Sequence, residues 1–265
     1  MARGEGLTAK GLSVRVAVLA DIHGNLPALE AVLAEVDAAG VDAIVLNGDL
    51  ADGPMPAETV DRLDELGQRA IWVGGNGDRW LVEAFDGTFQ PTGGATDALI
   101  TWGAGQLRQA HRDRLASLPL TVTMDIDGLG PVAFCHATAR DDNEMILVDS
   151  QVGHYRDAFA DLREQAVVIG HSHMPFDRLV DRRRVINSGA VGMPYGHLGA
   201  AWALLGPDVV LRRAPYDIEA AADTLAASTM PGIEEFIAEN VRAAPSDAEA
   251  LAVFTETVHQ QAGRR

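Results

Sequence analysis

The feature that most constrains the fold is an alternation of short apolar runs with helical stretches in the first third of the chain. Three runs are apolar and rich in β-branched residues, as is typical of buried strands: Val14–Ala20, Ala43–Leu46 and Ala70–Val73. Between them, apolar residues recur at helical spacing over Leu26–Ala39, and Pro56 opens a second helix that we expect to run to Leu66. This order predicts parallel strands joined by crossover helices.

After residue 118 the pattern changes from helices to closely spaced strands. Arg79–Leu118 is expected to be helical, with a break near Gly93 and Gly94. Gln151–Gln165 predicts one further helix, and the Ala- and Glu-rich chain from Asp217 predicts two or three more. The remaining apolar runs are expected to be strands: Leu120–Ile126, Pro131–His136, Val167–Ile169, Phe176–Val180, Arg184–Ile186, Ala200–Leu205 and Val209–Arg213.

These elements predict an α/β fold in which two sheets pack face to face, with helices outside. The chain has 265 residues, which is long enough for one large core. We expect residues 1–12 to be a flexible tail and residues 13–265 to form a single domain. The helices of residues 217–265 are expected to pack on that domain as a C-terminal extension.

Potential metal ligands follow five of the predicted strands. They stand in the segments D-I-H-G-N, N-G-D, G-G-N-G-D, F-C-H and G-H-S-H. The candidate ligands are Asp21, His23, Asp49, Asn76, His136, His171 and His173. Each alone has an ordinary explanation as a helix cap, a turn residue or a packed histidine. Together they lie at strand ends, where an open α/β sheet forms its ligand crevice, and they predict a metal site.

The residue types indicate which metals such a site would hold. Imidazole, carboxylate and amide ligands without a thiolate suit two divalent first-row cations; manganese is the expected metal, with iron, zinc or nickel as alternatives. Two such ions ~3.5–4 Å apart can clamp a phosphate and activate water. Asp49 is the candidate shared ligand, because a carboxylate has two oxygens. The formal net charge of −17 makes non-specific nucleic-acid binding unexpected, and it means that an anionic substrate needs such local positive charge.

Taken in order, the motifs D-x-H, G-D, G-N-x-D, H and G-H-x-H resemble those of the calcineurin-like metallophosphoesterase family over roughly Val14–Leu211. The resemblance implies a four-layer α/β/β/α sandwich, here with C-terminal helices. It implies attack of a metal-bridging hydroxide on a phosphoester, without a covalent enzyme intermediate. The ligand sets that it implies are Asp21, His23, Asp49 and His173 for one metal, and Asp49, Asn76, His136 and His171 for the other.

Further strings are similar to those of a subgroup of small bacterial and archaeal phosphodiesterase-type proteins. Among them are I-H-G-N-L-P-A-L-E, G-D-L-A-D-G-P-M-P and H-A-T-A-R-D-D-N-E. By this likeness Asn25 and Arg140 are candidate phosphate contacts, although Arg140 is equally well explained as a solvated loop residue. The implied substrate is a small phosphodiester, and a phosphomonoester or phosphoprotein is the alternative.

One position within the ligand motifs departs from the family pattern. The third motif usually reads G-N-H-D, and its histidine commonly serves as general acid, but here that position is Gly77. Gly77 is itself a candidate substrate contact. The candidate catalytic residues are Asp49, Asn76 and Asp78. Three explanations of the glycine are open: an acid supplied by water or from elsewhere, such as His154 or His197; a site widened for bulkier esters; or a catalytically weakened protein that binds a metal and phosphate as a regulator.

Other classes of protein fit these residues less well. The sequence contains neither the phosphate-binding loop G-x-x-x-x-G-K-[ST] nor the nucleophile motif G-x-S-x-G. Cys135 lies in an apolar run, so we expect a buried strand residue in a protein of a reducing compartment. No signal-peptide core and no run near the ~18 apolar residues of a spanning helix is present, so a cytoplasmic location without membrane contact is expected. The C-terminal helices leave a homo-oligomer open.

Overall fold

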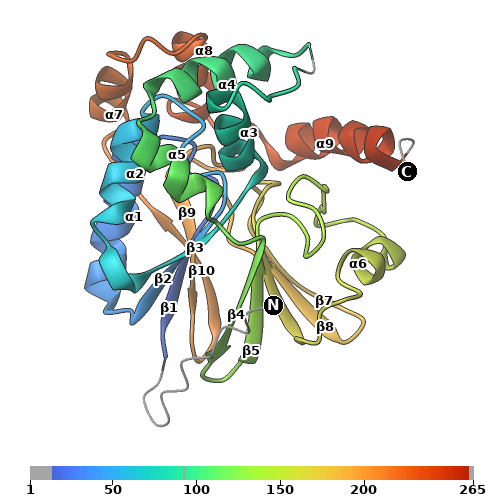
Figure 1. The fold of residues 1–265 in the computed structure, drawn as a ribbon. Helices are drawn as coiled ribbons and strands as arrows, with labels where there is room; N and C mark the ends of the chain where they lie inside the picture. Colours follow the sequence, from blue (N-terminus) through green and yellow to red (C-terminus); the bar gives the residue numbers. More distant parts are fainter. Residues whose placement is uncertain (1–13, 92, 263–265) are drawn as a thin grey trace.

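The computed structural model describes residues 14–91 and 93–262, and two five-stranded sheets form its centre (Figure 1). The first sheet contains, in spatial order, β10 (Val209–Ala214), β9 (Ala200–Leu205), β1 (Val16–Leu19), β2 (Ala43–Asn47) and β3 (Ala70–Val73). β1, β2 and β3 pair in parallel, as predicted from the alternation of strands and helices. β9 joins β1 antiparallel and β10 joins β9 antiparallel, so two strands from late in the chain complete this sheet.

The second sheet is built entirely from the middle of the chain. Its strands, in spatial order, are β4 (Thr121–Ile126), β5 (Gly130–Cys135), β6 (Ala166–Ile169), β8 (Arg183–Asn187) and β7 (Phe176–Val180). β5, β6 and β8 run parallel, whereas the outer strands β4 and β7 are antiparallel to their neighbours. In each sheet the carboxyl ends of the three parallel strands therefore lie at the same edge.

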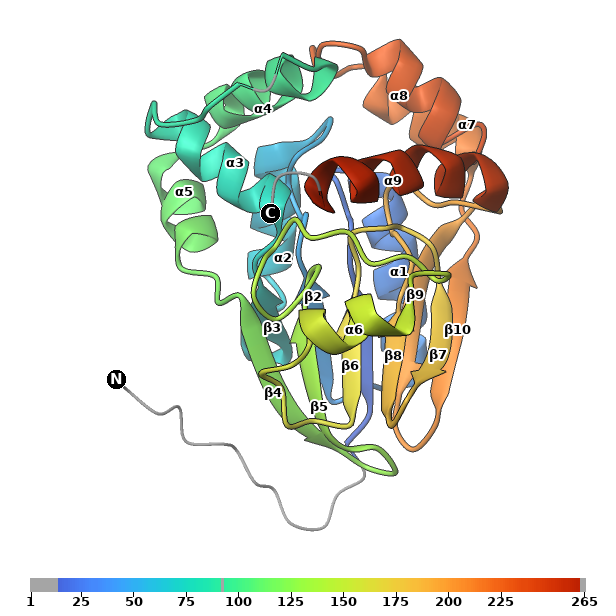
Figure 2. The same ribbon diagram turned by 90° about the vertical axis from the view of Figure 1, so that its right-hand side faces the viewer.

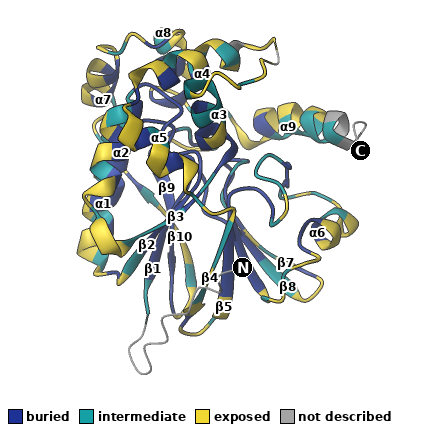
Figure 3. Ribbon diagram, viewed as in Figure 1, coloured by how far each residue is buried: buried dark blue, intermediate teal, exposed yellow. Residues whose placement is uncertain are grey.

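The two sheets pack against each other through alternate side chains of their strands. Val18 and Val45 of the first sheet meet Phe134, Val168 and Ile186 of the second in one buried cluster. In the inner strands β1, β2, β6 and β9 the intervening residues are buried as well, because helices cover the outer faces, whereas β4, β7 and β10 keep exposed residues. Burial on both faces explains why these inner strands read as continuous apolar runs rather than as alternating patterns (Figure 3).

Helices form the two outer layers. The helices are α1 (Leu26–Ala39), α2 (Pro56–Asp64), the short 3₁₀ helix η1 (Gly67–Arg69), α3 (Asn76–Phe85), α4 (Ala95–Gln106), α5 (Gln109–Ala116), α6 (Val152–Ala158), α7 (Ile218–Leu225), α8 (Ile233–Asn240) and α9 (Asp247–Ala262). Figures 1 and 2 show α1 and α2 outside the first sheet and α6 outside the second. The prediction of a four-layer α/β/β/α sandwich with C-terminal helices is confirmed.

Several predicted helix bounds are wrong. The helix from Pro56 ends at Asp64 rather than Leu66, and the stretch Arg79–Leu118 has a second break at Leu107 and Arg108. The helix expected over Gln151–Gln165 ends at Ala158, because the guanidinium of Arg183 binds the carbonyl oxygens of Phe159, Leu162 and Glu164 at 2.6–3.0 Å. Those carbonyl groups face a strand of the second sheet instead of continuing the helix. The helix expected from Arg79 begins earlier, at Asn76, so the G-N-G-D motif forms its first turn.

The predicted tail of residues 1–12 lies outside the described residues. Within the described part of the chain, none of the helices combines the length and the apolar character that crossing a bilayer requires.

Candidate metal centre

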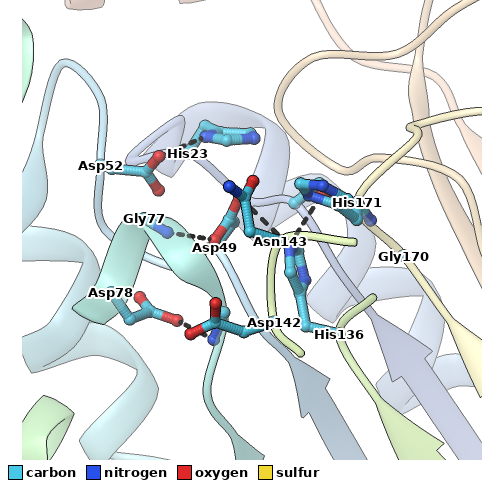
Figure 4. A network of polar contacts seen from close by, with 12 residues as sticks. His23, Asp49, Asp52, Gly77, Asp78, His136, Asp142, Asn143, Gly170 and His171 are labelled. Carbon is cyan, nitrogen blue, oxygen red and sulfur yellow. Dashed lines mark hydrogen bonds and ion pairs between the residues drawn. The ribbon is translucent and has the colours of Figure 1, made fainter. Parts of the chain in front are cut away.

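The carboxyl ends of five parallel strands, three from the first sheet and two from the second, deliver the predicted ligands to one place. Each of these strands is followed by at least one candidate ligand. In the first sheet, Asp21 and His23 follow β1, Asp49 follows β2 and Asn76 follows β3. In the second sheet, His136 follows β5, and His171 and His173 follow β6. All seven side chains come together there. Figure 4 shows Asp49, His136 and His171 turned toward one another, with His23 close by.

The first group of ligand atoms consists of Asp21, His23 and His173. Nε2 of His173 lies 3.1 Å from Nε2 of His23 and 3.3 Å from Oδ1 of Asp21. Octahedral or tetrahedral ligands on a cation with bonds of about 2.1 Å stand roughly 3.0–3.4 Å apart. The separations therefore fit three ligands of one cation.

The second group consists of Asp49, His136 and His171, again with all ligand atoms within 4.8 Å of one another. Nε2 of His136 lies 3.2 Å from Oδ2 of Asp49 and 3.9 Å from Oδ1 of Asp21, so the two groups adjoin. Asp49 also stands within reach of His23. Asp49 therefore lies between the two groups, and its role as the shared ligand stays a prediction.

The side-chain amide of Asn76 belongs to the second group. It ends 3.0 Å from Nδ1 of His171, 3.3 Å from Nε2 of His136 and 3.1 Å from the carbonyl oxygen of Asp142. As oriented in the structure, the amide oxygen faces these acceptor atoms and no donor. Turning the amide over lets its nitrogen donate to these atoms and its oxygen accept from the N–H of Gly77 at 3.2 Å. In either orientation the amide lies among the other ligand atoms of this group.

Three of the histidines are held so that Nε2 faces the centre. Nδ1 of His136 donates to the carbonyl oxygen of Asn47 at 2.9 Å, and Nδ1 of His173 donates to that of Met193 at 3.0 Å. Nδ1 of His23 lies 3.1 Å from Oδ2 of Asp52. An acceptor on Nδ1 sets the tautomer and leaves Nε2 free for a metal.

Backbone strain is concentrated at the same residues. Five candidate ligands have φ between 47° and 63°, in the left-handed region that side chains with a Cβ rarely adopt: Asp21, His23, Asp49, His171 and His173. Among the described non-glycine residues only Asp181 shares this property. Each such residue costs of order 1–3 kcal/mol, which is typical of functional sites held in shape by their surroundings.

The electrostatics of the centre follow from carboxylates and imidazoles buried together. Burial alone would lower the pKa of His23, but the adjacent Asp52 carboxylate outweighs it and raises this pKa to about 10. The pKa of His136 also rises to about 10, since Asp49 outweighs burial in the same way. Burial and the nearby His136 lower the pKa of His171 to about 4. The buried carboxylates thus attract positive charge, which protons or metal cations can supply.

Asp78, a predicted catalytic residue, links two of the motifs. Its Oδ1 accepts from the backbone N–H of Leu50 and its Oδ2 from that of Gly75, both at 3.0 Å. Burial, and next the negative charge of Asp49, raise its pKa to about 7. With both oxygens bonded to backbone, Asp78 holds the G-D and G-N-G-D loops together, and its catalytic role stays a prediction.

Gly77 faces inward but leaves no open space. Its N–H donates to Oδ1 of Asp49 at 2.7 Å. A Cβ built on Gly77 would lie 2.2 Å from Oδ2 of Asp52, so the carboxylate of Asp52 occupies the volume that a side chain at 77 would need. The explanation that the glycine widens the site is therefore wrong.

The two residues predicted to contact phosphate are engaged elsewhere. Asn25 caps α1: its Oδ1 accepts from the N–H of Ala28 at 3.2 Å and its Nδ2 donates to the carbonyl of Gly192 at 3.0 Å. Arg140 donates to both carboxylate oxygens of Glu144 at 2.7 and 2.8 Å. No bond of either side chain within the described residues reaches a candidate ligand, so phosphate contact by these two is unsupported.

The histidines considered as substitute acids lie away from the ligand atoms. His154 contacts Glu144 at 3.2 Å, beside Arg140. His197 is exposed in the loop before β9. Neither belongs to the groups of potential ligands found in the described part of the chain.

Two residues of the centre were missed by sequence reasoning. Asn47 ties β2 to β5, since its Nδ2 donates to the carbonyl of Cys135 at 3.0 Å while its own carbonyl holds His136. Asp52 holds His23. Asp52 stands in the string G-D-L-A-D-G-P-M-P, but the string assigns it no partner, and a second acid three residues after Asp49 is a spacing that many turns share.

Comparison with known proteins identifies the family to which the chain is similar. The family profile described as "Calcineurin-like phosphoesterase superfamily domain" matches residues 14–206. An uncharacterized protein of Methanocaldococcus jannaschii is 28% identical over 242 residues, which cover 82% of this chain and 93% of that protein.

Solved structures agree with the profile. A metallophosphoesterase from Sphaerobacter thermophilus is 27% identical and superposes with a TM-score of 0.69 over 88% of this chain and 99% of its own. A hypothetical protein from Pyrococcus horikoshii, 21% identical, shares the fold with a TM-score of 0.73 over 85% of this chain and 96% of its own. The chain described here belongs to the calcineurin-like phosphoesterase superfamily.

Proposed function

We propose that this protein is a metal-dependent phosphodiesterase with two divalent cations, manganese being the expected metal. The observation that carries the proposal is the pair of adjoining ligand groups on either side of Asp49. Asp21, His23 and His173 would hold one cation, and Asn76, His136 and His171 the other. Two bound cations supply the positive charge that lowers the pKa of a water molecule and offsets the charge of a phosphoester.

The surrounding charges favour a diester over a monoester. Asp49, Asp52 and Asp78 are buried together, and the ion pairs that arginines form in the described residues all involve acids outside the ligand groups. A phosphodiester carries one negative charge, whereas a monoester carries nearly two near neutral pH. The monoester would meet more repulsion without an arginine to offset it, so it is the alternative substrate.

The missing acid limits which esters react fast. Gly77 has no side chain to protonate a leaving oxygen, and such help is worth about 10²–10⁴-fold in rate. Nitrophenolate leaves without a proton. Esters of nitrophenol should therefore be hydrolysed much faster than esters of simple alcohols.

The test combines metal analysis with a pair of substrates. Protein loaded with Mn²⁺ should retain about two ions per chain and should hydrolyse bis(p-nitrophenyl) phosphate faster than p-nitrophenyl phosphate. A rate that favours the monoester would reverse the substrate assignment. Absence of stoichiometric metal under every loading condition would refute the proposal as a whole.

A second candidate is a regulator that binds a metal and phosphate without efficient turnover. Gly77 favours it, because the chain keeps the ligands but lacks the usual acid at this position. Such a protein would bind inorganic phosphate in a metal-dependent manner and would show no multiple turnovers on either nitrophenyl ester.

A further inference from the structure

The His23 ring is held differently from the other two histidines whose Nε2 faces the centre. His136 and His173 donate from Nδ1 to backbone carbonyl oxygens, which are neutral and fixed by the chain. Nδ1 of His23 instead meets a carboxylate, that of Asp52, at 3.1 Å. Both partners are buried, with exposures of 7% and 8%. Because a side-chain carboxylate can rotate, Asp52 can hold this ring only if neighbouring atoms fix the orientation of the carboxylate.

Gly77 provides the space in which the Asp52 carboxylate lies. A Cβ at position 77 would stand 2.2 Å from Oδ2, 2.3 Å from Cγ and 2.6 Å from Oδ1 of Asp52. All three distances are far shorter than carbon–oxygen or carbon–carbon van der Waals contact. Figure 4 shows Asp52 beside both His23 and Gly77.

The backbone of Gly77 does not itself require glycine. Gly77 lies in the first turn of α3, and its φ is outside the left-handed region, unlike that of Gly24 or Gly48. Glycine is a poor helix former, so the position would favour another residue on conformational grounds. The close approach of Asp52 is the physical reason that remains.

We propose that Asp52 is a positioning residue for His23, and that Gly77 is the residue that admits it. The Asp52 carboxylate accepts the Nδ1 proton, turns Nε2 of His23 toward His173 and Asp21, and makes the imidazole a stronger ligand. Asp52 can act in this way only if the metal centre proposed above is correct.

The first test measures Mn²⁺ binding by titration calorimetry. Asp52→Asn keeps the shape of the side chain and removes its charge, so one of the two sites should bind about 10–100-fold more weakly while the other changes less than about twofold. The matched control is Asp61→Asn, because Asp61 also pairs with a buried histidine, His111, at 3.0 Å, but outside the ligand groups. That control should leave both affinities unchanged.

The second test asks whether Gly77 acts through Asp52. Gly77→Ala should weaken the same metal site by a similar factor, and it should have no further effect on metal affinity in an Asp52→Ala background. Gly105→Ala is the control, since a Cβ on this other helical glycine meets no atom within 4 Å. If Gly77→Ala alone does not fold, recovery of folding in the Asp52→Ala double variant supports the steric link, and failure to recover overturns it.

The outcomes separate this role from the function it depends on. Wild-type protein that binds no metal refutes the metal centre. Wild-type protein that binds two ions, together with an unchanged Asp52→Asn variant, refutes only the role of Asp52. A variant that loses one ion completely at saturating Mn²⁺ would make Asp52 a ligand rather than a positioning residue. If the fold losses of Mn²⁺ affinity caused by Gly77→Ala and by Asp52→Ala multiply in the double variant, the link between Gly77 and Asp52 is refuted.

Discussion

The two sheets contribute different chemistry to the metal centre. Loops after the first sheet supply both carboxylates, the amide and one imidazole, whereas loops after the second sheet supply imidazoles alone. The first ligand group takes only His173 from the second sheet, and the second group takes His136 and His171. Neither of these two groups is complete within one sheet, although a third potential group, His23, Asp49 and Asp52, comes from the first sheet alone. The pair of adjoining groups therefore exists only where the two sheets pack against each other. Its integrity should depend on that packing more than on any single loop.

The shared carboxylate should produce the largest effect when it is lost. Asp49→Asn removes the charge between the two groups, and we expect kcat/KM for bis(p-nitrophenyl) phosphate to fall by about 10³-fold or more, since such charge is worth several kcal/mol. Metal content should fall from two ions toward one. Asp177→Asn, which alters an exposed pair with Arg184, is the control. If the Asp49→Asn variant keeps both metals and an unchanged turnover, Asp49 is not the shared ligand.

Two buried phenylalanines test whether the packing between sheets matters for metal binding. Phe134 lies between the sheets, and the equally buried Phe159 lies on the outer face of the second sheet with α6. Each change to alanine should lower the free energy of unfolding by about 3–5 kcal/mol, measured by urea denaturation.

Only Phe134→Ala should also weaken Mn²⁺ binding of the protein that remains folded, because it alone loosens the contact between the two sets of ligand loops. Equal losses of metal affinity in both variants would contradict the dependence on sheet packing.

After removal of the metal, the free energy of unfolding should fall as the pH rises into the alkaline range. The pKa values of His23 and His136 are raised to about 10, above the unfolded value near 6.5. A raised histidine pKa contributes stability that is fully present below pH 6.5 and is lost as the pH rises through about 10. Chelator-treated protein should therefore lose more than about 1 kcal/mol of unfolding free energy between pH 7 and pH 10.

Protein loaded with metal should show a smaller change over this range, because an imidazole bound to a cation has no proton to lose at Nε2. Urea denaturation at both pH values, with and without Mn²⁺, measures the difference. If the unfolding free energy changes equally with pH in the metal-free and the metal-loaded protein, these histidines do not respond to the metal.

The smallest effect concerns Cys135, which ends β5 in the second sheet. Burial raises the pKa of its thiol to about 12, so almost no thiolate exists at pH 8.5 in the folded protein. Alkylation by iodoacetamide should be undetectable in native protein on the time scale that labels urea-unfolded protein completely. Labelling of Phe134→Ala, but not of wild type, would show that loosening the sheets exposes this strand. Rapid alkylation of Cys135 in native wild-type protein would contradict the burial of this thiol.

The candidate ligands could be located from sequence because each one follows an apolar strand. Parallel strands of one sheet end at one edge, so Asp21, Asp49 and Asn76 could be placed together without coordinates. The helix at Gln151–Gln165 could not be bounded in this way, since the carbonyl groups that end it bind Arg183, a residue of a distant strand. Local periodicity contains no information about that partner.

The contacts of Asn25, Arg140 and Asp52 could not be predicted from the sequence for the same reason. Asn25 and Arg140 stand in the expected motifs, yet their donors are satisfied by Gly192 and Glu144. Asp52 stands in no strand-end position, and it matters only because folding brings it to His23.

The sequence by itself determined the order of strands and helices, the seven candidate ligands and the absence of a side chain at position 77. Those properties depend on residue type and spacing along the chain, which the sequence states directly. Only the tertiary structure decided that Gly77 makes room for Asp52 and that the two adjoining ligand groups each take residues from both sheets. Steric exclusion and metal geometry act over a few ångströms between residues far apart in the chain, so they are defined only once the sheets have packed.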